Sequence, residues 1–332
     1  MLVSNQPLVS VLLPVYNGAG FLEGGIESIL SQSYRNIELI IINDGSSDDS
    51  AKIIGNFQDP RIRAYHQENQ GLAATLNRAI NLAKGEYLAR QDQDDLSLPQ
   101  RIEKQVRFLD AHPNCGMVGV WAEIWVENVK SERTHQHPTE SSHLKYDLLF
   151  DNPFVHSSVM LRKSVCHTVG LYSTDKSRQP PEDYELWSRV ARHFEVANIP
   201  EVLLVYREVP NSMSRAGMSP FLDRVINISV ENLLWATGRK FPDRDVTDLA
   251  ALNHAAYQRV STRPSLRKLS GILFESADKL SDACSSPPSA LRERAQVRFT
   301  DIRNHYFRHM QARRFCGRLV DLLRAMKRVV AE

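Results

Sequence analysis

Two hydrophobic patterns alternate along the first 112 residues. Continuous apolar runs that end in polar turn residues occupy Val9–Tyr16 and Ile37–Asp44, and such runs are typical of parallel strands buried on both faces. Apolar residues at helical spacing lie between and after them, as in Leu72–Ala83. The predicted strands are 9–16, 37–44, 62–66 and 85–90, and the predicted helices are 21–30, 48–57, 72–83 and one opened by Pro99. This order predicts an α/β fold with a Rossmann-like, mostly parallel sheet and helices on both faces.

A different pattern begins near residue 117. The predicted strands here are 117–126, 155–161 and 202–206, and the predicted helices are 142–150 and 182–193. Beyond residue 214 the strand pattern stops and helical periodicity continues, interrupted by prolines. We therefore predict a catalytic domain over 1–214, with a ligand-binding half at 1–112 and a second half at 113–214, followed by a helical region at 215–332.

Charged residues are distributed unevenly along the chain. Hydrophobic residues make up 42% and charged residues 24% of the 332 residues, which is typical of globular proteins. Residues 213–332 carry 21 Lys and Arg against 12 Asp and Glu, whereas residues 1–212 carry 20 against 27. Two parts with different partners are therefore expected.

Cysteine usage and hydropathy bear on the cellular compartment. No apolar run approaches the roughly 18 residues that span a bilayer. The apolar stretch near the N-terminus has no basic region before it, so no signal peptide is predicted. The four cysteines lie far apart and show no metal-ligand spacing, which favours free thiols and a cytoplasmic location.

The sharpest chemical signal is a cluster of acids directly after the fourth predicted strand, at Asp92, Asp94 and Asp95. Carboxylates this close together repel one another unless a cation or full solvation compensates them. Mg²⁺ and Mn²⁺ prefer oxygen ligands and are commonly held by one or two carboxylates plus substrate phosphates. Such an ion would neutralise the charge on a departing diphosphate. The alternative is a solvated acidic turn that caps the following helix.

Two other groups of residues follow predicted strands and are expected at the same edge of the sheet. Asp44 either accepts a hydrogen bond from a nucleobase N–H or forms an Asx turn and helix N-cap. The segment Pro14–Asn17 offers backbone groups and one aromatic face. No G-x-G-x-x-G follows the first strand and no G-x-x-x-x-G-K-[ST] occurs, which argues against dinucleotide and Walker-type phosphate sites.

A third candidate lies at the start of a predicted helix, in the string Pro181-Glu182-Asp183. Acidic residues in a first helical turn interact favourably with the helix dipole, which alone accounts for them. The functional alternative is that a carboxylate held rigidly at a helix start removes a proton from an acceptor.

These strings together resemble one family. They are similar to the inverting family-two glycosyltransferases of bacterial polysaccharide assembly, whose nucleotide-sugar domain has the GT-A fold. The resemblance covers about residues 8–214. It is carried by P-V-Y-N-G, N-D-G-S-S-D, N-Q-G-L-A-A, G-x-Y-L-A-R-x-D-x-D-D, N-P-F-V-H-S, P-E-D-Y-E-L-W and Tyr206-Arg207.

The resemblance implies a role for each candidate residue. Asp94, together with Asp92, would bind Mn²⁺ or Mg²⁺, and Asp183 would be the general base with Glu182 shaping the pocket beside it. His156 would lie near the acceptor, a hydroxyl of a glycan or of a lipid-linked molecule, unless it is a satisfied structural histidine. The donor, expected to be a UDP-sugar, would be bound by Pro14, Tyr16, Asn17, Asp44, Asn69, Arg90 and Asp92.

Two features depart from the family pattern. Members commonly carry a histidine two residues after Tyr-Arg that completes the metal site, whereas here Tyr206-Arg207 is followed by Glu208 and Val209. The metal would then be bound more weakly or by Glu208. The Q-x-x-R-W signature of processive synthases is absent, which favours transfer of a single sugar.

The segment 313–330 predicts an amphipathic helix with basic residues beside its apolar face. Such a helix either lies on an anionic membrane, giving a peripheral location at the inner face, or packs on the catalytic domain or a second subunit. No aromatic platform accompanies the basic residues, so no nucleic-acid partner is expected. Two rival functions remain, a nucleotidyltransferase that forms sugar nucleotides and a non-catalytic module that binds them.

Overall fold

The computed structural model describes the backbone of residues 6–209 and 218–329, and the side chains of 6–209 and 221–312. Two compact units divide the chain, residues 1–225 and 226–332. The predicted division after residue 214 remains a prediction, because residues 210–217 lie outside the described part.

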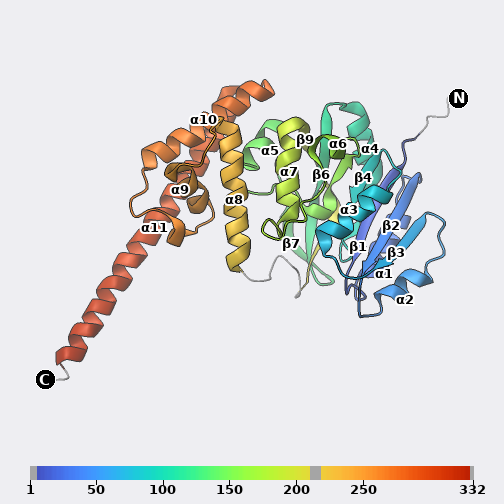
Figure 1. Ribbon diagram of the computed structural model, residues 1–332, viewed down its shortest axis with the longest axis horizontal. Coiled ribbons are helices and arrows are strands. Elements are labelled where there is room, and N and C mark those ends of the chain that lie inside the picture. Colours follow the sequence, from blue (N-terminus) through green and yellow to red (C-terminus); the bar gives the residue numbers. More distant parts are fainter. Residues whose placement is uncertain (1–5, 210–217, 330–332) are drawn as a thin grey trace. The chain divides into compact units, whose positions relative to one another are not determined.

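The first half of the sheet is parallel, as the apolar runs predict (Figure 1). Strand β1 (Val9–Val15) pairs with β2 (Ile37–Asp44) on one side and with β4 (Tyr87–Arg90) on the other. Strand β3 (Ile62–Gln67) pairs with β2 at the edge. Both β1 and β2 are buried along their whole length, which explains why they read as continuous apolar runs.

The second half of the sheet mixes directions. The short strand β8 (Met160–Arg162) runs antiparallel between β4 and the long strand β6 (Cys115–Val126). Strand β6 pairs in parallel with β9 (Glu195–Glu208). In the described part of the chain the sheet has nine strands, in the order β3-β2-β1-β4-β8-β6-β9-β5, with β7 paired to β6.

Three details of the predicted strands are wrong or incomplete. The predicted strand 155–161 is instead a 3-10 turn at His156–Ser158 followed by β8, because the Ser158 main-chain N–H and hydroxyl both donate to the Val155 carbonyl and close a turn. The predicted strand 202–206 is the last part of the 14-residue β9. The patterns do not predict β5 (Leu96–Ser97) or the polar strand β7 (Val129–His135).

Helices cover both faces of the sheet. The apolar faces of α1 (Leu22–Leu30), α2 (Ser50–Asn56) and α4 (Arg101–Ala111) share one core with β1 and β2. Helix α3 (Leu72–Leu82) packs on β1 and β2 with a separate set of buried residues (Figure 1). The remaining helices of this unit are α5 (Ser141–Asp147), α6 (Val165–Val169) and α7 (Glu182–His193). Every helix predicted up to residue 193 has a counterpart in the structure.

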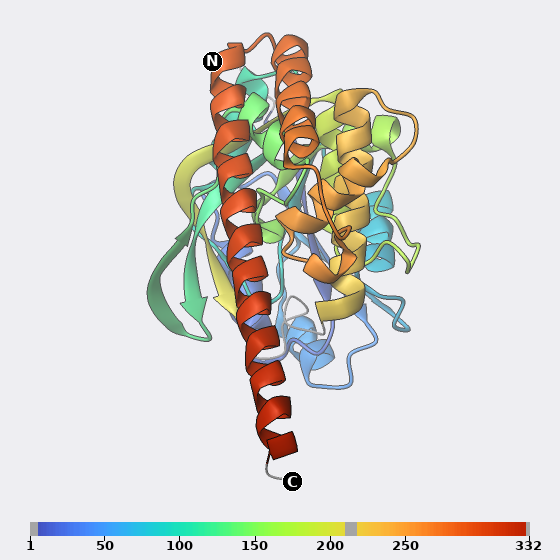
Figure 2. The same ribbon diagram turned by 90° about the vertical axis from the view of Figure 1, so that its left-hand side faces the viewer.

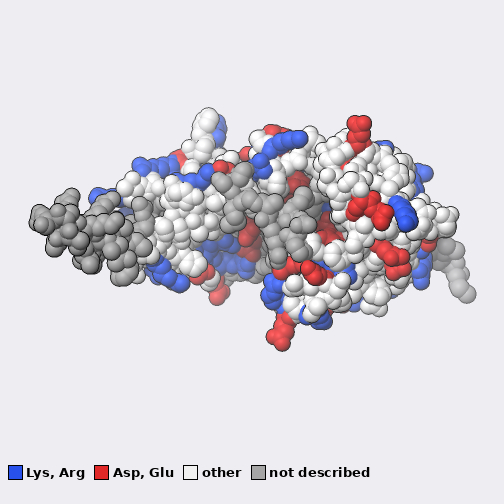
Figure 3. Space-filling view, turned by 90° about the horizontal axis from the view of Figure 1, so that it is seen from below, with Lys and Arg blue, Asp and Glu red and all other residues white. Residues whose placement is uncertain are grey.

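The C-terminal unit contains only helices in its described part. Helix α10 and the first part of α11 lie side by side (Figure 2). Lys and Arg side chains are spread over the described part of this unit on the face that Figure 3 shows. The helices are α8 (Met218–Thr237), which crosses the division between the units, α9 (Arg244–Asn253), a 3-10 turn at Tyr257–Arg259, α10 (Leu266–Cys284) and α11 (Pro288–Val329).

Candidate active site

The candidate residues of the first half lie just past the carboxyl ends of β1, β2 and β4, which are neighbouring parallel strands. This edge is where open α/β sheets bind ligands. Tyr16 and Asn17 follow β1, Asp44 ends β2, and the acidic turn, defined as Asp92–Asp95, follows β4.

Asp44 is buried, with 4% of its surface exposed, and its carboxylate is largely occupied by the loop before α3. Its Oδ1 accepts hydrogen bonds from Gln67 Nε2 at 2.7 Å and Gln70 N at 2.9 Å, and its Oδ2 accepts one from Gly71 N at 2.9 Å. The Asn69 amide donates to the Asp44 main-chain carbonyl at 3.0 Å. Asp44 therefore shapes the loop at the start of α3 rather than capping the helix that follows it in sequence. A carboxylate accepts about four hydrogen bonds, so room for one further donor remains.

Asn17 connects the loop after β1 to the loop after β2. Its backbone has a φ of 49°, in the left-handed region that asparagine tolerates. Its N–H donates to Ser46 Oγ at 3.0 Å and its side-chain oxygen accepts from Ser47 N at 2.8 Å. Tyr16 beside it is 52% exposed. An aromatic ring is thus presented to solvent at this edge by a backbone that is held on both sides.

The three acids of the turn have different environments. Asp95 is buried, accepts from the Ser157 hydroxyl and from Arg207 N, and burial raises its pKa well above the usual range. Asp95 is therefore structural. Asp92 is 30% exposed, and burial together with the Asp92 charge raises the pKa of Asp94 to about 6. These two carboxylates are the ones available to a ligand.

A buried network supports the acidic turn from beneath. Arg101 is fully buried and donates to the Arg90 carbonyl, to Gln91 Oε1 and to Ser97 Oγ. The Gln91 amide in turn donates to the main-chain carbonyls of Asp92 and Asp95. Because buried polar groups are costly unless they are satisfied, these bonds hold the turn in one conformation.

The charge of Arg90 acts on residues of both the acidic turn and the start of α7. Arg90 is 2% exposed and forms a 2.5 Å ion pair with Asp92. Its charge also opposes the rise in the pKa of Asp94 and of Glu182, and it adds to the lowering of the pKa of His156. Arg90 therefore lies within electrostatic reach of all four residues, as a central positive charge.

Asp183 lies in the first turn of α7, in a fixed orientation. Its Oδ2 accepts a hydrogen bond from Asn152 Nδ2 at 2.8 Å, and its Oδ1 accepts from Tyr184 N at 2.8 Å. Glu182 is only 6% exposed, and burial together with the Asp183 charge raises its pKa to about 7. Asp183 is the less buried member of this pair, and it is the one that Asn152 orients.

His156 is packed against the aromatic side chains of Tyr172 and Trp187. Its Nε2 lies 3.1 Å from the Tyr172 hydroxyl and its ring packs edge-on to Trp187 at 6.0 Å. Burial lowers the pKa of His156 to about 4, so the ring is neutral at pH 7. The charges of Asp183 and Asp92 act on it in the opposite direction, which places His156 close to both sides of the site.

Arg207 is the residue whose position the sequence did not reveal. Its Nη1 donates to the Asp94 carbonyl at 2.8 Å, and its guanidinium lies 5.2 Å from the Phe21 ring and 5.9 Å from the Trp125 ring. Such cation–π contacts fix a guanidinium in place. The sequence signal for this residue is the Tyr206-Arg207 string, which by itself does not predict that Arg207 contacts the acidic turn.

The neighbouring Glu208 forms an ion pair with a residue of β7. Its carboxylate is paired with both terminal nitrogens of Arg133 on β7, at 2.9 and 2.8 Å. Such a bidentate pair uses both carboxylate oxygens. That Glu208 supplies the missing metal ligand remains a prediction, and in this structure its carboxylate is engaged by Arg133.

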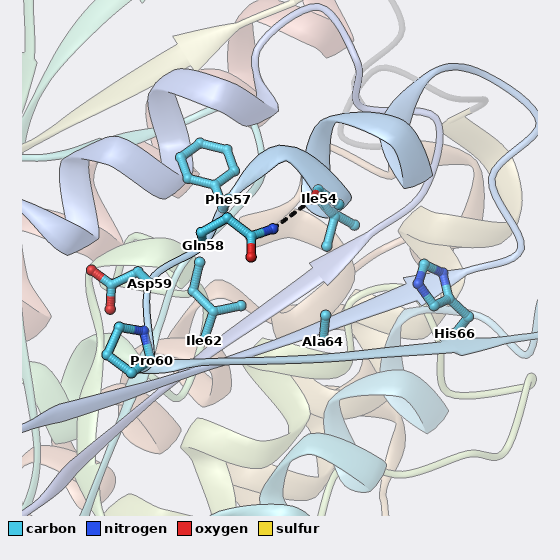
Figure 4. Close-up of a pocket in the computed structure, with 9 residues that line it drawn as sticks. Ile54, Phe57, Gln58, Asp59, Pro60, Ile62, Ala64 and His66 are labelled. Carbon is cyan, nitrogen blue, oxygen red and sulfur yellow. Dashed lines mark hydrogen bonds between the residues drawn. The ribbon is translucent and has the colours of Figure 1, made fainter.

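A surface cavity lies away from these residues. It has a volume of about 420 Å³ and is formed by residues of α2, β3 and the loop between them, from Ile54 to His66 (Figure 4). None of the predicted site residues lines it. We assign it no part in the chemistry, because the charged groups lie at the carboxyl ends of the strands instead.

Comparison with known proteins identifies the family. The protein EpsE of Bacillus subtilis (strain 168), named as a glycosyltransferase, is 34% identical over 230 residues, covering 68% of this chain and 81% of EpsE. The pattern of glycosyl transferase family 2 matches residues 10–170. The chain belongs to glycosyl transferase family 2. An uncharacterized glycosyltransferase of Haemophilus influenzae is 32% identical over 64% of this chain and 69% of its own length.

Solved structures share the fold of this family 2 chain. TarS of S. aureus (residues 1–349), in complex with UDP-GlcNAc, superposes with a TM-score of 0.61 at 15% identity over 92% of each chain. The mannosyltransferase PcManGT of Pyrobaculum calidifontis, in complex with GDP-Man and Mn²⁺, gives 0.51 at 18% identity over 89% of this chain and 81% of that one. The predicted GT-A fold with a helical C-terminal region and the predicted glycosyltransferase activity are confirmed.

Among the residues that the structure describes, no helix is both long and apolar enough to cross a bilayer. The individual roles of the site residues stay predictions.

Proposed function

We propose that this family 2 enzyme transfers a single sugar, with inversion, from a UDP-sugar to a hydroxyl of a glycan or lipid-linked acceptor. The observation that carries the proposal is the position of Asp183. It is oriented by Asn152 at the start of α7, while Arg90 lies within electrostatic reach of both this helix start and the acidic turn. A base on one side and an anion-binding region on the other is the arrangement that a direct displacement needs.

A divalent ion fits the acidic turn only in part. No group of three or more His, Cys, Asp or Glu residues that could hold a metal is preformed among the described residues. Asp92 and Asp94 supply two carboxylates, which suits Mg²⁺ or Mn²⁺ when phosphate oxygens of the donor complete the coordination. When bound, the ion would neutralise charge on the diphosphate.

Arginine side chains add to this anion-binding region. The Nε groups of Arg90 and Arg207 are buried beside the acidic turn, and neither has a hydrogen-bond partner among the described residues. Guanidinium groups match phosphate oxygens in geometry and charge. We propose that Arg207 binds the leaving diphosphate, because its contacts with Phe21 and Trp125 fix it next to Asp94.

The proposed chemistry takes place in one step. The acceptor oxygen attacks the anomeric carbon from the face opposite the diphosphate, and Asp183 takes the proton of that hydroxyl. The bond to the diphosphate oxygen breaks as the new glycosidic bond forms, so the anomeric configuration inverts. Neutral His156 and the buried Glu182 line the acceptor side without carrying the proton.

Two considerations support uracil as the base of the donor nucleotide. Tyr16 and Asp44 present an exposed aromatic ring and a carboxylate at the end of β1 and β2. Two structures of TarS, which shares the fold, hold UDP-GlcNAc or UDP.

A donor screen tests the proposed function directly. With Mn²⁺ and a panel of UDP-, GDP- and CMP-sugars, we expect slow hydrolysis of one UDP-sugar and release of UDP, measured by coupled assay. NMR of the glycosidic product formed with an acceptor hydroxyl, which does not mutarotate, should show the anomer opposite to that of the donor. Release from GDP- or CMP-sugars alone would contradict the uridine assignment, and retention of configuration would contradict the direct displacement.

We also propose that the C-terminal segment holds the enzyme at the inner face of the cell membrane. The helical backbone of α11 continues to Val329, whereas the side chains of the predicted amphipathic segment 313–330 lie outside the described residues. We expect the full chain to float with vesicles containing anionic phosphatidylglycerol and a chain ending at residue 312 to stay in the pellet fraction. Equal flotation of both chains, or self-association of the full chain without vesicle binding, would contradict the proposal.

A further inference from the structure

Gln93 lies between the two proposed metal ligands and reaches back to the end of β1. Its side-chain Nε2 donates to the Tyr16 carbonyl at 3.0 Å, and its Oε1 accepts from Tyr16 N at 2.9 Å. An amide that binds both backbone groups of one residue fixes that residue in position and in orientation. The acidic turn and the loop that presents Tyr16 are therefore joined by one side chain.

The sequence leaves room for this contact on both sides. A Cβ at Gly18 would lie 2.3 Å from Gln93 Oε1, and a Cβ at Gly25 would lie 3.0 Å from the Gln93 carbonyl. Distances of this kind require a shift of the neighbouring atoms. Glycine at both positions allows the acidic turn to lie directly against the loop after β1.

The same loop is anchored on its other side by the residues after β2. Ser46 Oγ accepts from Asn17 N at 3.0 Å, Ser50 Oγ accepts from Gly18 N at 3.0 Å, and Asp48 Oδ2 accepts from Ala19 N at 2.9 Å. Within this loop, Tyr16 is thus hydrogen-bonded to the acidic turn, whereas the three residues after it are hydrogen-bonded to residues that follow β2. A change in the acidic turn reaches the loop through Gln93.

We propose that Gln93 is a positioning residue that couples nucleobase binding at Tyr16 to diphosphate and metal binding at Asp92 and Asp94. The inference rests on the proposed function, because it assigns the two ends of the donor to these two places. A ligand bound at Tyr16, or at Asp92 and Asp94, restricts the motion of the Gln93 side chain. Less conformational entropy is then lost when the other part of the donor binds.

The test divides the donor into two fragments that are not covalently linked. Uridine represents the nucleoside end, and inorganic pyrophosphate with Mn²⁺ represents the other. Calorimetry gives the affinity for each fragment with and without saturating amounts of the other. We expect each to strengthen the binding of the other by at least about fivefold in the unaltered chain, the lower end of measured couplings between sites.

Gln93→Met keeps the length of the side chain and removes both hydrogen bonds to Tyr16. We expect the coupling factor to fall below about twofold, while Mn²⁺-pyrophosphate alone binds as before. Gln93→Ala provides a second variant, and Gln100→Met is the matched control, because Gln100 is an exposed glutamine before α4. The control should keep the full coupling, and thermal unfolding identifies any variant that fails to fold.

The outcomes separate this inference from the proposed function. If the unaltered chain binds both fragments and Gln93→Met keeps the coupling, Gln93 is not the connection, although the donor site stands. Independent binding of the two fragments in the unaltered chain also overturns the inference. If neither uridine nor Mn²⁺-pyrophosphate binds at all, the donor assignment fails and the coupling fails with it.

Discussion

Replacing Asp183 with Asn lowers kcat by about 10²–10⁴-fold, the usual contribution of a general base, and leaves UDP affinity within about twofold. Asn keeps the size of the side chain and can still accept from the Tyr184 N–H through its oxygen, whereas its amide nitrogen replaces the oxygen that accepts from Asn152 Nδ2. It cannot accept the proton of the acceptor hydroxyl. Single-turnover transfer and calorimetry with UDP, measured on the same preparation, separate chemistry from binding.

A matched control for this substitution lies in the preceding loop. Asp175 is an exposed acid whose carboxylate accepts hydrogen bonds from the main-chain N–H and the hydroxyl of Ser177, so Asp175→Asn should keep full activity. Near-normal turnover in Asp183→Asn would move the base role to another group. Glu182 would then be the first candidate, because its raised pKa leaves it partly protonated near pH 7.

Replacing Asp94 with Ala abolishes the metal dependence of nucleotide binding. In the unaltered chain we expect Mn²⁺ to strengthen UDP binding by at least about tenfold, equivalent to about 1.4 kcal/mol. In Asp94→Ala the affinities with Mn²⁺ and with EDTA should coincide, because one carboxylate at Asp92 holds the ion poorly. Titration calorimetry with UDP under both conditions measures the difference.

The fold should survive this change. Burial and the Asp92 charge disfavour the ionised form of Asp94, and Arg207 bonds to the main-chain carbonyl of residue 94, which alanine retains. Asp49→Ala is the matched control, since Asp49 is exposed and its side chain makes no capping bond. Unchanged metal-dependent binding in Asp94→Ala would remove Asp94 from the metal site.

The elements that the sequence predicted well are those whose burial repeats along the chain. Strands β1 and β2 are buried at every position, so their apolar runs are unambiguous. Strand β7 is mostly exposed and polar, and β5 has only two residues, so neither carries a periodic signal. The turn at 156–158 looked like a strand because the hydroxyl bonds that close it are not visible in hydropathy.

In the candidate site, too, local patterns predicted some features and missed others. Short strings placed Asp92, Asp94 and Asp183 after a strand and at a helix start, which depends only on local order along the chain. No local pattern could indicate that Asp95 is the buried structural member of its cluster, or that Arg207 contacts the acidic turn from the far end of β9. Those contacts join residues more than a hundred positions apart.

The sequence by itself therefore determined the α/β class, the helices of the first 193 residues and the glycosyltransferase family, because these depend on periodicity and on short motifs in order. Only the tertiary structure decided which acids are free, how Asn152 orients Asp183, and how Gln93 joins Tyr16 to the acidic turn. The physical reason is that hydrogen bonding and desolvation of a side chain are set by neighbours in space. Those neighbours come from other strands and helices, and their identity appears only when the sheet brings its strand ends together.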